Sequence, residues 1–219
     1  MKDIYIMAGG PIELIPDSLP NTEGAFWIGV DRGISTLLAR DIHPSIVFGD
    51  FDSVAKDDLH KIKKENIEIY TYPPEKDDTD LGLAVEWALE QKPDHIHIYG
   101  STGGRFDHMM GAIQLLLANR TLSGKSKVTI YDRSNVIYAV LPGNYSILQD
   151  DKYTYTSFFP ISSEVKGITL LGFKYPLNKK DILLGSTLCV SNELISNIGT
   201  FSFDYGILLV VRSSDHRAF

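Results

Sequence analysis

Cysteine is nearly absent from this 219-residue chain, and Cys189, in the segment STLCVSN, is the only one. A single thiol excludes an intrachain disulfide, so the composition favours a reducing compartment and we expect a cytoplasmic protein. Because Cys189 lies in an apolar, strand-like run, we expect it to be a small buried side chain rather than a nucleophile.

Long apolar runs and excess positive charge are also missing. No stretch approaches the roughly 18 consecutive apolar residues of a membrane-spanning helix, and the apolar part of MKDIYIMAGG is too short for a secretory signal. The formal net charge is −7, which disfavours broad binding to nucleic acid or to an anionic membrane surface. We therefore expect neither nucleic acid nor a membrane among the partners.

Several common catalytic motifs are lacking. The chain contains no GxxxxGK[ST] segment, its GSTGGR turn follows a late strand without dinucleotide-binding spacing, and no nucleophile elbow supports Ser-His-Asp catalysis. His43, His60, His95 and His97 show no zinc-ligand spacing with cysteine. His95 and His97 share one face of a predicted strand, where we interpret them as packed or solvated side chains.

What is present in the first two-thirds is an alternation of two patterns. Such alternation predicts βαβ units and a mostly parallel sheet flanked by helices. The strand-like segments are 3–9, 25–31, 45–50, 67–73, 95–101 and 127–132. The helix-like segments between them are 33–42, 55–66, 78–92 and 106–120.

The pattern changes between residues 133 and 145. From there no long helical period occurs, and short strand-like runs follow at 144–150, 153–161, 167–177, 186–195 and 200–211, separated by Gly, Pro, Asn and Ser. This pattern predicts an antiparallel β-sandwich. The expected fold is thus α/β plus all-β, with an α/β domain at 1–135 and a sandwich at 136–219.

Four polar clusters in the first domain follow a predicted strand or precede a predicted helix. In a parallel sheet, ligands gather at the carboxyl ends of the strands, so we expect these clusters to share one edge. The clusters are VDRG (Asp31, Arg32, Gly33), FGDFDS (Asp50, Asp52), EKDDTD (Asp77, Asp78, Thr79, Asp80) and GSTGGRFDH (Thr102, Gly103, Gly104, Arg105, Asp107, His108).

Each cluster by itself has an ordinary structural interpretation. Asp77 or Asp78 is a suitable helix N-cap, and Gly103 and Gly104 permit a tight turn without any ligand. Together, however, several converging carboxylates repel one another unless a cation separates them. Aspartate oxygens suit Mg²⁺, a glycine-rich turn offers N–H groups to an anion, and arginine binds phosphate oxygens. The combination predicts a site for Mg²⁺ and a polyphosphate.

The same blocks, in this order, resemble the thiamine pyrophosphokinase family: GDFDSV, DDTDLGLA, GSTGGRFDHMMGAIQLL, GFKYPL and VSNE. The resemblance extends from about Gly29 to the end of the chain. It implies an N-terminal ATP-binding α/β domain, a C-terminal β-sandwich for thiamine binding and dimerisation, and a homodimer. It further implies Mg²⁺-dependent transfer of the pyrophosphoryl group of ATP to the hydroxyethyl oxygen of thiamine, giving thiamine diphosphate and AMP.

Site residues carried over from this resemblance fall into four groups. The implied metal ligands are Asp50, Asp52, Asp80 and Asp77. The implied nucleotide-binding residues are Asp31, Arg32, Gly33, Thr79, Thr102, Gly103, Gly104 and Arg105. The implied catalytic residues are Asp107, Arg105 and Asp80, with Asp107 orienting the alcohol or accepting its proton. The implied thiamine-binding residues are His108, Ser191, Asn192 and Tyr175, although Tyr175 also suits a place in the core.

One departure from the family pattern concerns the first cluster. The family usually has DGG where this chain has Asp31-Arg32-Gly33, so Arg32 either closes the backbone's approach to a ligand or adds a phosphate contact. Two alternative functions stay open. A different Mg²⁺-dependent phosphotransferase or phosphohydrolase would turn over ATP without thiamine, and a non-catalytic nucleotide-binding module would bind ATP without forming product.

Overall fold

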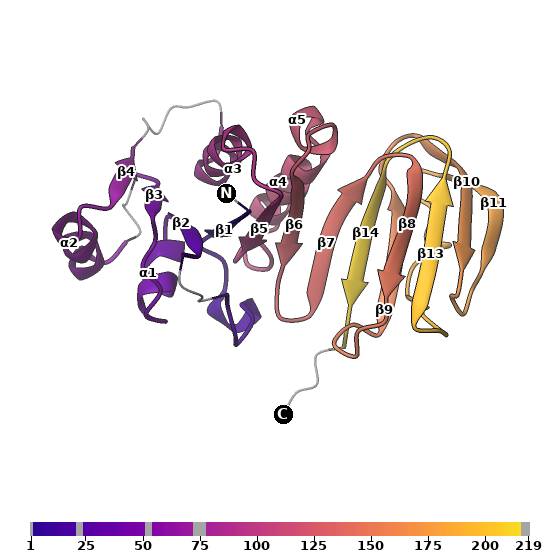
Figure 1. The fold of residues 1–219 in the computed structure, drawn as a ribbon, viewed down its shortest axis with the longest axis horizontal. Helices are drawn as coiled ribbons and strands as arrows, with labels where there is room; N and C mark the ends of the chain where they lie inside the picture. Colours follow the sequence, from indigo (N-terminus) through magenta and orange to yellow (C-terminus); the bar gives the residue numbers. More distant parts are fainter. Residues whose placement is uncertain (1, 21–23, 51–53, 72–77, 216–219) are drawn as a thin grey trace. The chain divides into compact units, whose positions relative to one another are not determined.

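The computed structural model describes residues 2–20, 24–50, 54–71 and 78–215. The chain divides into two compact units, Met1–Arg133 and Ser134–Phe219 (Figure 1). The first unit is α/β and the second is a sandwich of antiparallel strands, so the predicted fold class is confirmed. Within the described ranges, no helix is long and apolar enough to cross a membrane.

The centre of the first unit is a parallel sheet. Its strands pair in the order β6-β5-β1-β2-β3-β4, so the chain starts in the middle and crosses over between β4 and β5. The strands are β1 (Asp3–Met7), β2 (Phe26–Val30), β3 (Ile46–Phe48), β4 (Glu68–Tyr70), β5 (His95–Tyr99) and β6 (Lys127–Tyr131). Buried residues such as Ile4, Ile6, Ile28 and Ile96 explain why β1, β2 and β5 form inner strands.

Helices cover both faces of this sheet. On one face, α1 (Gly33–Leu38) and α2 (Lys56–Lys64) pack Ile34 and Ile62 against Val47. On the other face, α3 (Asp80–Glu90) stacks Trp87 on Phe26. The remaining helical elements are η1 (Ile12–Leu14), α4 (Phe106–Leu117) and α5 (Asn119–Leu122).

The predicted helices form where the sequence places them, with one break. The segment 106–120 does not continue as one helix, because Ala118 adopts an extended conformation with ψ 140° and separates α4 from α5. The N-terminus of α3 is capped by Thr79, whose Oγ1 accepts a hydrogen bond from the Gly82 N–H at 3.0 Å. Of the two aspartates considered as a possible cap, Asp78 does not cap α3, and Asp77 lies outside the described residues.

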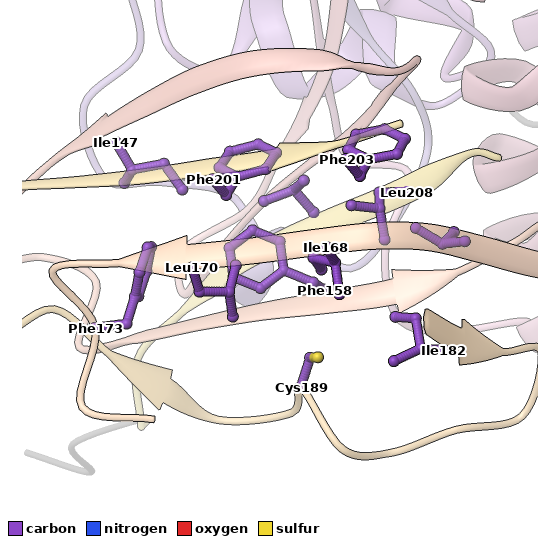
Figure 2. Packing of buried hydrophobic residues seen from close by; sticks show 12 residues of the cluster. Ile147, Phe158, Ile168, Leu170, Phe173, Ile182, Cys189, Phe201, Phe203 and Leu208 are labelled. Carbon is purple, nitrogen blue, oxygen red and sulfur yellow. The ribbon is translucent and has the colours of Figure 1, made fainter. Parts of the chain in front are cut away.

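The second unit consists of two antiparallel sheets packed on a common core. One has the order β12-β9-β14-β7 and the other β11-β10-β13-β8. The strands are β7 (Asn135–Val140), β8 (Gly143–Leu148), β9 (Tyr155–Pro160), β10 (Glu164–Leu171), β11 (Leu177–Leu183), β12 (Asn192–Glu193), β13 (Ile198–Phe203) and β14 (Leu208–Ser213). Figure 2 shows Phe158, Leu170, Phe173 and Phe201 meeting in this core.

Strand boundaries in this unit differ from the predictions. The segment 186–195 is mostly turn, with only β12 as strand, and 200–211 is two strands separated by a bend at Gly206, where φ is +102°. Cys189 lies in that turn, and its carbonyl oxygen accepts a hydrogen bond from the Phe158 N–H. Its side chain is nevertheless buried in the core, as predicted (Figure 2), and burial raises the pKa of the thiol to about 11.

Candidate active site

The loops that follow β1 and β5 are joined by backbone hydrogen bonds at the carboxyl edge of the sheet. The Ala8 N–H donates to the Tyr99 carbonyl at 2.8 Å, and the Gly10 N–H donates to the Gly100 carbonyl at 2.7 Å. A Cβ on Gly10 would collide with the Gly100 carbonyl oxygen, so glycine is required at this contact. This MAGG loop was not predicted as part of the site, although the glycine pair that ends the strand-like run was an available signal.

The glycine-rich turn after β5 has the backbone conformation that its glycines permit. Gly103 and Gly104 have φ of +72° and +63°. The hydroxyl oxygens Ser101 Oγ and Thr102 Oγ1 are buried and have no hydrogen-bond partner in the part of the chain that the structure describes. Buried polar atoms are normally paired, so these hydroxyls mark a place where a bound group can supply the partner.

The VDRG cluster follows β2 and contacts the ends of both neighbouring strands, β1 and β3. Asp31 has a positive φ of 48°, and its N–H donates to the Phe48 carbonyl at 3.1 Å. A Cβ on Gly33 would collide with the Met7 carbonyl oxygen, so α1 begins in close contact with the end of β1. The Arg32 side chain is exposed at the N-terminus of α1. The structure thus places this cluster beside the loop after β1.

The predicted metal ligands are only partly described. Asp50 is exposed just after β3, and Asp80 is half-buried as the first residue of α3, while Asp52 and Asp77 lie outside the described residues. Asp50 follows β3 at the same edge of the sheet that carries Asp31. The hydrogen bond from the Asp31 N–H to the Phe48 carbonyl joins the end of β3 to the VDRG cluster. Carboxylate oxygens are the donor set that suits a hard divalent cation such as Mg²⁺.

Arg105 and Asp107 form a bidentate ion pair at the N-terminus of α4. Arg105 Nε donates to Asp107 Oδ1 at 3.1 Å and Arg105 Nη2 donates to Oδ2 at 2.6 Å. The Arg105 guanidinium, with the His108 N–H at 3.0 Å, holds the pKa of the Asp107 carboxyl at about 2. Both side chains are about two-thirds exposed, at 69% and 66%, so they are accessible to a ligand.

Phe106 lies between these two residues and was not predicted as a site residue from the sequence. Its side chain is 68% exposed, which is unusual for phenylalanine at the start of a helix. His108 follows on the same exposed turn. An exposed aromatic ring beside a charged pair can stack on a planar ligand.

The predicted thiamine-binding residues of the second unit meet at one place. Asn192, which is buried, holds the backbone of Tyr175 on both sides: its Oδ1 accepts from the Tyr175 N–H at 3.0 Å, and its Nδ2 donates to the Tyr175 carbonyl at 2.9 Å. Ser191 has a φ of 55° and donates its N–H to Ser157 Oγ at 2.9 Å. The Tyr175 ring is 58% exposed, so it does not belong to the core.

Comparison with known proteins explains this combination of sites. The family model described as "Thiamin pyrophosphokinase, catalytic domain" matches residues 21–130, and "Thiamin pyrophosphokinase, vitamin B1 binding domain" matches residues 144–208. A thiamine pyrophosphokinase from Bacillus subtilis (strain 168) is 50% identical over 216 residues, covering 98% of this chain and all of the relative. The chain belongs to the thiamin pyrophosphokinase family.

Other members of the thiamin pyrophosphokinase family agree in sequence and fold. Thiamin pyrophosphokinase 1 from Caenorhabditis elegans is 27% identical, covering 83% of this chain and 79% of the relative. The crystal structure of the Bacillus subtilis enzyme superposes with a TM-score of 0.92 at 49% identity, covering 98% and 100% of the two chains. The Geobacillus thermodenitrificans structure gives 0.89 at 44% identity, covering 99% and 100%. The recognition made from the sequence motifs is confirmed.

Proposed function

We propose that this chain transfers the pyrophosphoryl group of ATP to the hydroxyethyl oxygen of thiamine, giving thiamine diphosphate and AMP. Membership of the thiamin pyrophosphokinase family supports both substrates. The observation that carries the proposal is the Arg105–Asp107 pair beside the glycine-rich turn. It offers a forked cation for phosphate oxygens and a carboxylate for an alcohol at one place.

The nucleotide binds to the first unit, residues 1–133, in this proposal. Helix α4 begins directly after the turn that contains Gly103 and Gly104, and its N-terminus has no side-chain cap. The partial positive charge of a helix N-terminus favours an anionic ligand there. The unpaired hydroxyls of Ser101 and Thr102 supply further polar contacts there. Arg32 of the VDRG cluster, exposed at the start of α1, adds a phosphate contact.

Asp50, Asp52, Asp77 and Asp80 hold Mg²⁺ in this proposal. A bound Mg²⁺ would supply charge neutralisation to the phosphate oxygens during transfer. The described members, Asp50 and Asp80, present carboxylate oxygens of the kind that this ion prefers.

In the free protein Arg105 and Asp107 are hydrogen-bonded to each other, and we propose that substrate binding breaks this pair. Phosphate oxygens compete with the Asp107 carboxylate for the Arg105 guanidinium, because both are oxyanions that fit its donor fork. Loss of that partner raises the pKa of Asp107 from about 2 toward its ordinary value. Asp107 then orients the thiamine hydroxyl and accepts its proton as the oxygen bonds to the β-phosphorus and AMP leaves. Arg105 balances the charge that develops on the phosphoryl oxygens.

Thiamine binds to the second unit, residues 134–219, in this proposal. The exposed Tyr175 ring stacks on the planar heterocycle, and Asn192 fixes its backbone rather than contacting the ligand, because its amide is already hydrogen-bonded on both sides. The second unit also carries exposed apolar side chains, which support a homodimer: Leu171, Leu183, Leu184, Leu188, Ile195 and Ile198. Light scattering of the purified protein tests the dimer. We further propose a cytoplasmic location, which the single unpaired thiol supports.

A product assay tests the function. The purified protein is incubated with ATP, MgCl₂ and thiamine, and AMP, ADP and thiamine diphosphate are separated and quantified. We expect equal amounts of AMP and thiamine diphosphate, with the reaction abolished by EDTA and restored by excess MgCl₂. ADP or free phosphate without thiamine diphosphate would instead indicate another phosphotransferase or phosphohydrolase, and ATP binding without product would indicate a binding module.

A further inference from the structure

Three polar side chains meet on the first sheet, away from the site described above. Asp3 begins β1, and His95 begins β5 opposite it in the parallel register, with His97 two residues along on the same face. One ligand atom from each residue lies within 4.8 Å of the others. The catalytic loops follow Met7 and Tyr99 at the opposite ends of these strands, about 13 Å away at the usual rise per residue.

The spacing of these atoms fits a transition metal. His97 Nε2 and Asp3 Oδ1 are 3.3 Å apart. Two ligand atoms at about 2.0–2.1 Å from a tetrahedral Zn²⁺ lie about 3.3 Å apart, so this pair needs little movement to share an ion. The His95 ring is oriented by a hydrogen bond of 2.8 Å between its Nε2 and Thr129 Oγ1. Such a second partner commonly orients metal-binding histidines.

The electrostatics also suit a cation. The side chains of His97 and Asp3 are only 16% and 31% exposed. The Asp3 carboxylate supplies a negative charge beside the two imidazole rings, and a cation held between them would be paired with that charge. Lys127 of β6, which pairs with His95 in the sheet, adds a positive charge that disfavours a bound cation. The Asp3 carboxylate compensates for that charge.

We propose that Asp3, His95 and His97 bind one divalent transition metal, of which Zn²⁺ is the representative, with water completing the coordination. Two imidazoles and one carboxylate are a common ligand set for such metals, whereas Mg²⁺ prefers oxygen ligands alone. The ion would join β1 to β5 at their amino ends. It is therefore a structural site, separate from the carboxylates assigned to the proposed catalytic Mg²⁺.

The competing interpretation is that the histidines only pack. His97 stacks on Tyr5 and on Tyr131, with ring centroids 4.8 and 5.4 Å apart, and its ring lies 4.0 Å from that of His95. Stacking of this kind requires no metal. Packing alone predicts that removing the Asp3 carboxylate leaves metal affinity unchanged, and this separates the two interpretations.

The test is a Co²⁺ titration of the tag-free, chelator-treated full chain in excess MgCl₂, followed by visible absorption and by calorimetry. We expect one equivalent to bind with the intense d–d absorption of a low-coordinate site, and to be displaced by Zn²⁺. Asp3→Asn and His97→Gln should each weaken binding by at least about tenfold. Zn²⁺ should raise the melting temperature of the wild type but not that of these variants.

Two controls make the result specific. His60→Gln removes an exposed imidazole on α2, and Asp80→Asn removes a carboxylate from the proposed Mg²⁺ site; both should leave the Co²⁺ affinity unchanged. Asp3→Asn conserves shape, so it stays informative where His97→Gln fails to fold. Absence of saturable Co²⁺ binding, or wild-type affinity in Asp3→Asn, would overturn the proposal, while the product assay would still report on the proposed function independently.

Discussion

Arg105 and Asp107 neutralise each other at the N-terminus of α4, through two hydrogen bonds of 3.1 and 2.6 Å. The two side chains assigned to catalysis are therefore partners in the free protein. Because both side chains are exposed, the ion pair contributes little to the stability of the fold. We expect its functional effect to arise when a ligand binds Arg105 and breaks the pair.

Replacing Asp107 should affect turnover far more than nucleotide binding. Asp107→Ala removes the carboxylate that we propose faces the alcohol, and it frees Arg105 to bind phosphate. We therefore expect kcat to fall by about 10²–10⁴-fold, with ATP affinity equal or slightly higher. Steady-state kinetics and ATP calorimetry measure the two effects. Asp151→Ala, at an exposed turn of the second unit, is the matched control. An unchanged kcat would exclude Asp107 from the chemistry.

The pH dependence of Asp107 follows from the same ion pair. Its pKa in the folded protein, about 2, lies below the ordinary value, so the stabilisation by Arg105 is complete above the unfolded-state pKa and is lost as the pH falls through about 2. The acidic limb of kcat/KM in the free enzyme should therefore not arise from Asp107. Carboxyl NMR titration should show its pKa rising in Arg105→Gln and in the ATP complex, and an equal pKa in all three states would contradict the pairing.

Gly33 should tolerate no side chain. In Gly33→Ala the new Cβ meets the Met7 carbonyl oxygen, so α1 must move away from β1, and we expect a loss of about 1–3 kcal/mol in the free energy of unfolding. Gly111→Ala on α4 is the matched control, because its Cβ would meet nothing within 4 Å. That control should gain about 0.5–1 kcal/mol from improved helix propensity. Urea denaturation of the two variants should show a lower free energy of unfolding for Gly33→Ala and a higher one for Gly111→Ala.

Thr79 should contribute to stability through its cap. Thr79→Ala removes the oxygen that accepts the Gly82 N–H, so we expect the free energy of unfolding to fall by about 1 kcal/mol. Thr79→Ser keeps a hydroxyl at the cap and should restore most of that loss. If the two variants are equally stable in urea denaturation, the cap does not stabilise α3.

Asn192 should act on thiamine through Tyr175. Asn192→Ala leaves the partly buried Tyr175 N–H and carbonyl without their partner, so we expect a loss of about 1 kcal/mol in stability. The KM for thiamine should rise more than the KM for ATP, because the Tyr175 backbone is no longer held. Asn197→Ala, on the exposed surface of the same unit, serves as control. Equal changes in both KM values would argue for a purely structural role.

The sequence by itself determined the elements and the family. Buried strands and amphipathic helices carry local periodicities, so the alternation of α/β elements could be predicted, as could the site motifs, whose residues are close together in the chain. Strand ends in the second unit were less predictable. There, residues 186–195 are apolar enough for a strand, but they form turns that bury Cys189.

Only the tertiary structure decided which distant residues meet. The contact of Gly10 with Gly100, the Asn192 amide on the Tyr175 backbone, and the approach of Asp3 to His95 and His97 all depend on pairing between separate segments. Strand order and register set such pairings, and both result from packing of the whole unit rather than from any local pattern. For this reason the histidines of β5 appeared ordinary in the sequence, and became a candidate metal site when β1 paired beside them.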